Sequence, residues 1–169
     1  DWNYWRVFFL VALYIGARVG HIRQMEWSEL DFESGVWLVP IGKMKGKRDA
    51  VIVLPRMIVD LLRDWRKQSR KSRFVFPGRE VTKPIIEIRH AWVKLCREAE
   101  LVNLHPHDLR RTFGTWQLQS GASMATVRDS LSQRDIRVTQ NAYAHVDVGH
   151  VRASVEETVR RFAETRPSQ

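Results

Sequence analysis

The sequence has a single cysteine and contains neither an internal repeat nor a low-complexity segment. Cys96 has no partner for an internal disulfide, and a lone thiol on the apolar face of a predicted helix fits a reducing compartment and inert packing. The most apolar run, Val7 to Ala17, is too short to span a membrane and follows Arg6 directly. It predicts a buried helix, and no membrane anchor or targeting signal is visible.

Positive charge is abundant. The 169 residues include 28 Lys and Arg against 19 Asp and Glu, a net charge of +9. In a folded domain this excess favours a polyanionic partner, most simply nucleic acid, although ribosomal and membrane-surface proteins share it. A hydrophobic content of 44% is enough for one core, so we expect a single domain over residues 1–169. Because Asp1 begins in helical pattern without an initiator methionine, we expect a piece of a longer protein.

Hydrophobic patterning predicts a mainly helical fold with a small antiparallel β-sheet, of the α+β class. Two β-rich runs, 36–41 and 50–54, flank a polar loop that contains glycine, which is typical of a hairpin. Elsewhere apolar residues recur at helical spacing. Helices are expected at 2–17 with an end near Gly16, then up to about Met25, from Pro55, from Pro84, at 106–120, at 123–131 with Ser123 as N-cap, at 136–143 and from about Val148. Residues 27–35 are predicted as connector and turn, and 66–73 as a solvated basic loop.

The most informative stretch is 106–114, read as the opening of a helix. Its apolar residues recur at i, i+4 and i+7 and predict a core-facing stripe: Leu109, Phe113 and Trp116. His107 and Arg110 lie three apart and project from a neighbouring face. An imidazole and a guanidinium directed at one point suit a phosphate, and Gly114 would let a ligand backbone come close. The alternative is a partly exposed basic helix with a capping histidine.

Short motifs follow one another in a fixed order along the chain: Gly16-Ala17-Arg18, a lysine in the hairpin, His107-x-x-Arg110 and Tyr143-Ala144-His145. This order resembles the catalytic domain of a tyrosine recombinase of the phage integrase family, and the resemblance extends from about Trp5 to Phe162. It implies an enzyme that breaks and rejoins DNA at specific sites without metal or ATP. The implied partner is double-stranded DNA, bound by a homo-tetramer (or a monomer as isolated domain) in the bacterial cytoplasm at the nucleoid, with no membrane.

The resemblance also implies roles for individual residues. Tyr143 would be the nucleophile, and Arg18 and Arg110 would hold the non-bridging oxygens of the scissile phosphate, as two guanidiniums can. His107 would bind phosphate and help to manage the tyrosine proton. In the hairpin tip, Lys45 is the best match to the general acid, with Lys43 as the alternative.

The sequence departs from the family pattern in three features. His21 stands where an acidic or amide residue is usual, three positions past the first arginine. Ser132-Gln133 replaces Gly-His, so a hydrogen-bond donor remains at Gln133 but not a group that carries a proton. Tyr143 follows Gln133 by ten residues, where nine is more typical of the family. Activity is therefore expected to survive in reduced form.

Further DNA contacts are expected from basic residues of the same motifs and loops: Lys43, Lys47, Arg48, Arg111 and Arg134. The last helix, within 148–165, carries an apolar stripe that fits docking on a neighbouring protomer and packing on its own domain equally well. The rival functions are a DNA-binding module of the same fold with weak or no catalysis, a basic RNA-binding or ribosomal-type protein, and a type IB topoisomerase.

Overall fold

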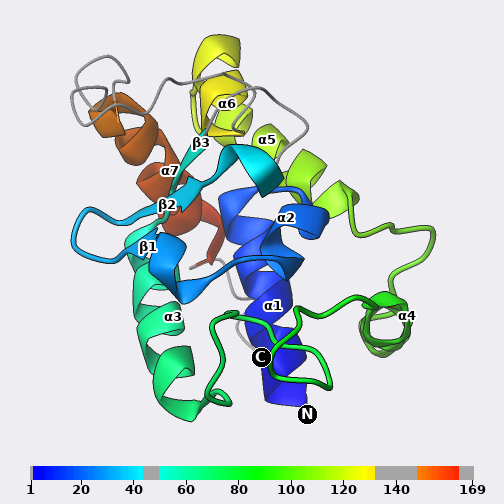
Figure 1. Cartoon of the computed structure of the whole chain (residues 1–169). Coiled ribbons are helices and arrows are strands. Elements are labelled where there is room, and N and C mark those ends of the chain that lie inside the picture. The colour runs from blue at the N-terminus through cyan, green and yellow to red at the C-terminus, as the bar shows by residue number, and fades with distance from the viewer. Residues whose placement is uncertain (1, 44–49, 132–147, 164–169) are drawn as a thin grey trace.

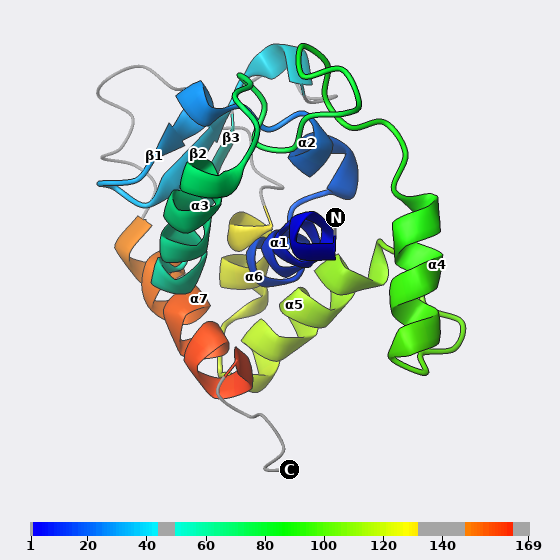
Figure 2. The same cartoon turned by 90° about the horizontal axis from the view of Figure 1, so that it is seen from below.

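Helix α1 (Trp2–Ile15) is the central element of the fold. The computed structural model describes three stretches of the chain: residues 2–43, 50–131 and 148–163. Seen along its axis, α1 is enclosed by helices from later in the chain (Figure 2). Its apolar residues are buried on nearly every face, as the hydrophobic run predicts. The helix ends before Gly16, whose φ of +61° lies in the left-handed region that favours glycine.

Six further helices and a three-stranded sheet complete the described fold (Figure 1). The helices are α2 (Val19–Arg23), α3 (Arg56–Gln68), α4 (Arg89–Glu98), α5 (Asp108–Gln119), α6 (Met124–Ser130) and α7 (Val148–Ala163). Short 3₁₀ turns lie at Trp27–Glu29 and Ile41–Lys43. The predicted N-cap of α6 is confirmed, because Ser123 Oγ accepts a hydrogen bond from the Thr126 backbone N–H at 3.1 Å. The α+β class predicted from the sequence is confirmed.

The sheet contains the predicted hairpin and one strand that the sequence analysis assigned to a connector. Strands β2 (Val36–Val39) and β3 (Ala50–Val53) pair antiparallel in the register Val36↔Val53 to Val39↔Ala50. Strand β1 (Leu30–Asp31) pairs with the other edge of β2. It has two residues, too few to show an alternating pattern, and its pairing depends on the tight turn that follows. There Asp31 Oδ1 accepts hydrogen bonds from the backbone N–H groups of Glu33 and Ser34, both at 3.0 Å.

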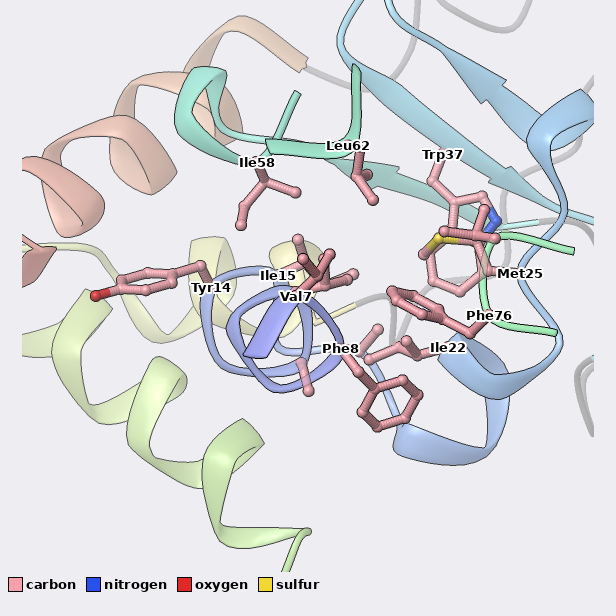
Figure 3. Packing of buried hydrophobic residues seen from close by; sticks show 14 of the residues in the cluster. Val7, Phe8, Tyr14, Ile15, Ile22, Met25, Trp37, Ile58, Leu62 and Phe76 are labelled. Atoms are coloured by element: carbon pink, nitrogen blue, oxygen red, sulfur yellow. The ribbon is translucent and has the colours of Figure 1, made fainter. Parts of the chain in front are cut away.

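One continuous core joins α1, the sheet and α3. Phe8 and Ile15 of α1 are fully buried, and so are Trp37 of β2 and Leu62 of α3. Figure 3 shows these side chains around α1, with Ile22 and Met25 of the α2 region closing one side. A chain of edge-to-face aromatic contacts extends this core toward the start of α1. Ile15, the last residue of α1 before Gly16, belongs to the same core.

Helix α4 begins later than the sequence predicts. Pro84 was expected to open it, but the helix begins at Arg89. The preceding residues are extended because they pair with the segment after α3: Ile85 N–H donates to the Phe76 carbonyl at 3.0 Å, and Pro84 forms an isolated bridge with Pro77. Proline can begin a helix, but it can equally lie in an extended segment. Here the pairing with residues 76–77 selects the extended conformation.

Helix α7 packs its apolar stripe on its own domain. Val151 and Val155 join Val53 of β3 and Phe113 of α5 in a second buried cluster. Further along, Phe162 stacks on Trp116 with ring centroids 4.8 Å apart. Of the two alternatives for this helix, the structure displays packing within the chain.

Candidate functional site

Arg110 is a buried cation that ties three helices together. It is 7% exposed on α5. Its Nη1 donates to the Gly16 carbonyl at 2.7 Å and its Nη2 to the Leu131 carbonyl at 2.8 Å, which links α5 to the ends of α1 and α6. Burial, with a smaller contribution from Arg18, lowers the pKa of Arg110 to about 10, so the group stays charged at neutral pH. A guanidinium has more N–H donors than these two bonds use, so donors remain for a ligand.

The turn at Gly16 has room for glycine alone. A Cβ on this residue would lie 2.4 Å from Cδ1 of Phe113 and 2.7 Å from Cδ2 of Leu131. Close packing of α5 and α6 on the end of α1 therefore depends on the missing side chain. The same turn directs a carbonyl at Arg110 and places Arg18 two residues further on. In the Gly-Ala-Arg motif, Gly16 thus allows the close packing, and the turn it forms positions the charges of Arg18 and Arg110.

Arg18 and Arg110 form a cationic cluster at this turn, with the imidazole of His21 beside them. Arg18 is exposed at the N-cap of α2, and its carbonyl accepts the His21 backbone N–H at 2.8 Å. Burial lowers the pKa of the half-buried His21, and the charges of Arg18 and Arg110 lower it further. Within the described stretches no carboxylate forms an ion pair with either arginine. Positive groups that meet without a counter-charge make a site for an anion.

The start of α5 presents His107 to solvent. His107 occupies the N-cap position but makes no capping bond through its side chain, so the capping-histidine alternative does not describe its role. Asp108 orders the helix start instead, because its Oδ2 accepts the His105 backbone N–H at 2.8 Å and its Oδ1 accepts from Arg111 Nη1 at 3.3 Å. The first of these bonds is the main cause of the lowered pKa of Asp108. The exposed His107 imidazole is left available on the same helix as Arg110.

The expectation that Gly114 admits a ligand backbone is wrong. The residue is buried, and a Cβ there would lie 3.5 Å from Cδ1 of Leu131 and 3.6 Å from Cγ1 of Val127. Gly114 therefore faces α6 from inside the domain, and a Cβ there would make only ordinary van der Waals contacts.

Lys43, at the root of the β2–β3 loop, is already neutralised. Its Nζ lies 2.9 Å from Glu26 Oε1, forms a second ion pair with Glu29, and donates to the Gln24 carbonyl at 2.7 Å. The Glu29 side chain is 8% exposed, and its other oxygen accepts the Trp37 indole N–H at 3.1 Å. This arrangement fastens Lys43 to the turn after α2. A lysine held by two carboxylates has little charge to offer a further ligand.

Several predicted site residues lie outside the described stretches: Lys45, Lys47, Arg48, Gln133, Arg134 and Tyr143. Of the others, the structure brings Arg18 and Arg110 together, holds Lys43 in an ion-pair network, and leaves His107 and Arg111 exposed. His21, beside the cluster, is the residue that the sequence analysis noted without a role. Its spacing of three from Arg18 is one helical turn, a signal that both side chains share a face.

Among the described residues, no group of His, Cys, Asp and Glu side chains is arranged to hold a metal ion. Nor does any helix in the same stretches have the length and apolar character needed to cross a membrane.

The fold and the cluster define a class of protein: a helical domain with a small sheet that assembles cationic side chains at the end of its central helix. The chain belongs to the phage integrase family, whose sequence profile matches residues 3–150. A tyrosine recombinase XerC from Xanthomonas axonopodis pv. citri (strain 306) is 30% identical over 141 residues, which cover 80% of this chain and 45% of the relative. The chain thus spans about half the length of such relatives.

Solved structures share the fold. The integrase of mycobacterium phage Brujita has a TM-score of 0.70 at 23% identity, covering 99% of this chain and 55% of that one. A XerH site-specific recombinase bound to its difH substrate, in a pre-cleavage complex, has a TM-score of 0.62 at 17% identity, covering 85% of this chain and 43% of that one. At these identities the likeness establishes the architecture, and the chemistry has to be argued from this chain's residues.

Proposed function

We propose that this chain is the catalytic domain of a site-specific DNA recombinase, which cuts and rejoins double-stranded DNA through a 3′-phosphotyrosyl intermediate. The cationic cluster is the observation that carries the proposal. Arg110 is fixed by two carbonyls with donors to spare, Arg18 is exposed beside it, and neither has a carboxylate partner among the described residues. Such a pair can grip both non-bridging oxygens of a phosphodiester and stabilise the charge that grows in its transition state.

Tyr143 is the nucleophile in this proposal. The chain has 3 tyrosines, and the other two belong to α1. Tyr4 donates to the Pro77 carbonyl at 3.0 Å, and burial raises the pKa of its phenol, the opposite of what a nucleophile requires. Tyr14 is 8% exposed in the core. Both are committed to packing, which leaves Tyr143 with the family motif around it.

The reaction is a pair of transesterifications. The Tyr143 phenol oxygen bonds to phosphorus as the bond to the 5′-oxygen breaks, the phenol proton leaves with the help of His107, and a general acid protonates the departing oxygen. A 5′-hydroxyl from a partner duplex then attacks the phosphotyrosine and releases the enzyme. Because the second step needs a second DNA end, the reaction calls for an assembly on DNA, which we propose is a homo-tetramer.

The contacts of Lys43 help to choose between Lys43 and Lys45 as the general acid. Its ammonium is held by Glu26, Glu29 and the Gln24 carbonyl, so a proton given to DNA would break this network. We therefore assign the acid to Lys45, two residues further on, and assign to Lys43 the anchoring of the loop that carries it.

Gln133 fits a phosphate contact near Arg110. The Leu131 carbonyl is bound by Arg110, and Gln133 follows by two residues, which span at most about 7 Å of extended chain. A side-chain amide at that position can donate to a non-bridging oxygen. We propose this role for Gln133, with DNA-backbone contacts from Lys47, Arg48, Arg111 and Arg134 around it.

Covalent trapping tests the proposal. The full-length parent protein is incubated with nicked DNA from its source genome, and adducts that survive denaturant are isolated and their DNA ends sequenced. We expect adducts with the parent and with Tyr14→Phe, a matched control in the core, and none with Tyr143→Phe. Absence of adducts from every form, with DNA still retained in a shift assay, would contradict catalysis.

A DNA-binding module of the same fold is the second candidate. It is favoured by Gln133, which cannot carry a proton, and by the ten-residue spacing to Tyr143. It predicts DNA retention that depends on Arg18 and Arg110 and is indifferent to Tyr143→Phe. The trapping experiment separates the two functions, because only the recombinase forms a denaturant-resistant bond.

A further inference from the structure

We propose that Gln117 and Ser130 are positioning residues for Arg110. A buried hydrogen bond between them holds the end of α6, where the Leu131 carbonyl accepts a bond from Arg110. The inference rests on the proposed function, in which Arg110 binds the scissile phosphate. Neither Gln117 nor Ser130 belongs to the motifs that carry the family resemblance, so their role is assigned by their contacts.

Two contacts attach one face of α5 to the end of α6. Arg110 and Gln117 are seven residues apart on α5, about two helical turns, so their side chains share a face. Arg110 Nη2 donates to the Leu131 carbonyl at 2.8 Å. Ser130 Oγ donates to Gln117 Oε1 at 2.6 Å. Because Ser130 and Leu131 are consecutive, the second bond fixes the residue next to the carbonyl that Arg110 binds.

The bond between Gln117 and Ser130 lies inside the domain. Gln117 is fully buried, and Ser130 is 5% exposed. The Ser130 Oγ also lies 2.9 Å from the Val127 carbonyl oxygen, one turn earlier in α6, so the hydroxyl is held between two acceptors. Away from water, such a bond meets little competition and favours one arrangement of the two helices.

The amide nitrogen of Gln117 makes this pair unfavourable as mere packing. Gln117 Nε2 is buried and has no hydrogen-bond partner in the described part of the chain. A buried N–H group without a partner costs free energy, and a leucine of similar size would fill the space without that cost. Stability alone therefore does not account for an amide at this position, whereas the direction of its bond to Ser130 does.

Arg110 depends on this direction because its guanidinium is held at both ends. Nη1 donates to the Gly16 carbonyl and Nη2 to the Leu131 carbonyl, so these two oxygens set the plane of the group. Gly16 follows a residue of the main core, whereas Leu131 follows the last turn of α6. A shift of that turn would redirect the remaining N–H groups, and a misdirected donor stabilises the transition state less.

The first test needs no cleavage. In the full-length Tyr143→Phe protein without DNA, NMR follows the exchange of the Arg110 guanidinium protons with water, and the signals are assigned by their loss in Arg110→Lys. We expect Ser130→Ala to speed this exchange about fivefold to tenfold, because the Leu131 carbonyl is then held less firmly. The control Ser154→Ala removes a buried hydroxyl that has no partner in the described structure, and it should leave the exchange unchanged. Equal exchange with and without the Ser130 hydroxyl would overturn the proposal.

The second test is a double-mutant cycle on cleavage, with the DNA ends recovered by trapping. We expect Ser130→Ala and Gln117→Leu each to slow single-turnover cleavage about fivefold to tenfold. DNA affinity should change less than about twofold, since other phosphate contacts supply most of it. The double variant removes both polar partners, so it should fold as well as the parent and cleave no more slowly than either single variant. Ser154→Ala should cleave like the parent.

The outcomes separate the positioning pair from the proposed function. Parent-like cleavage by the folded double variant, or single losses that multiply in it, would refute the pairing of Gln117 with Ser130. Faster guanidinium exchange in Ser130→Ala, together with no covalent adducts from the parent, would leave the positioning of Arg110 intact and contradict catalysis alone.

Discussion

Two cations of this protein, Arg110 and Lys43, lie in opposite surroundings. Arg110 is held by the carbonyls of Gly16 and Leu131, with Arg18 and His21 beside it. Lys43 is held by the carboxylates of Glu26 and Glu29. Carbonyls orient a guanidinium and leave its charge intact, whereas two carboxylates cancel an ammonium.

Arg110 is therefore suited to binding an anion, whereas Lys43 serves as a structural contact. In the sequence both are basic residues inside family motifs, and the resemblance offers both as site residues. The structure distinguishes them by their partners. The positive potential at Arg110 attracts an anion, whereas the carboxylates beside Lys43 cancel its charge.

Replacing Arg110 should have the largest effect, because it is both a ligand and a tie between helices. For Arg110→Lys we expect cleavage to fall by about 10²–10³-fold and the free energy of unfolding to fall by about 3 kcal/mol, since a lysine cannot bridge two carbonyls and a phosphate at once. Single-turnover kinetics and denaturant unfolding measure the two losses. Arg97→Lys, an exposed arginine on α4, is the control and should change neither.

Arg18→Lys sharpens this prediction. Arg18 is exposed, with no side-chain bond in the described structure, so its replacement should slow cleavage without lowering stability. If both arginine variants lost stability equally, the distinction between a buried tie and an exposed ligand would not hold.

Gly16 tests the packing that supports Arg110. Gly16→Ala would force a side chain into a left-handed backbone 2.4 Å from Phe113, and we expect a loss of about 3 kcal/mol in the free energy of unfolding. Gly20→Ala is the matched control, since a Cβ there meets nothing within 4 Å and alanine favours the helix. Thermal unfolding of the two variants measures this difference in stability. A Gly16→Ala protein as stable as the parent would refute the close fit.

Lys43 should show a smaller effect of a different kind. For Lys43→Met we expect cleavage to fall about tenfold, because the loop that carries Lys45 loses its anchor while the acid itself remains. A substrate with sulfur at the 5′-bridging position has a leaving group that needs no proton, and it should restore cleavage by Lys43→Met and by Lys45→Met. Failure of the sulfur substrate to restore the Lys43 variant would show that the anchor acts elsewhere.

Elements with strong local signals were predictable from sequence. The apolar run of α1, the two β-rich runs around a polar loop and the stripe of α5 are all visible within short stretches of sequence, so their types were confirmed. The start of α4 and the existence of β1 were missed because both depend on pairing with distant backbone. In the site, the motifs identified Arg18 and Arg110, whereas the use of Lys43 as an anchor depends on Glu26 and Glu29, which no motif connects to it.

The smallest predicted effect is on the pH dependence of stability, and it returns to His21. Its pKa in the folded protein lies below the ordinary value of 6.5, so in the window just below that value the unfolded chain binds more protons than the folded one. Stability should therefore fall as the pH drops through this window, and His21→Gln should flatten that part of the curve. Denaturant unfolding of both proteins at pH values on either side of 6.5 isolates the contribution of His21. An unchanged curve for His21→Gln would contradict the unfavourable surroundings of the protonated ring, which burial and the two arginines create.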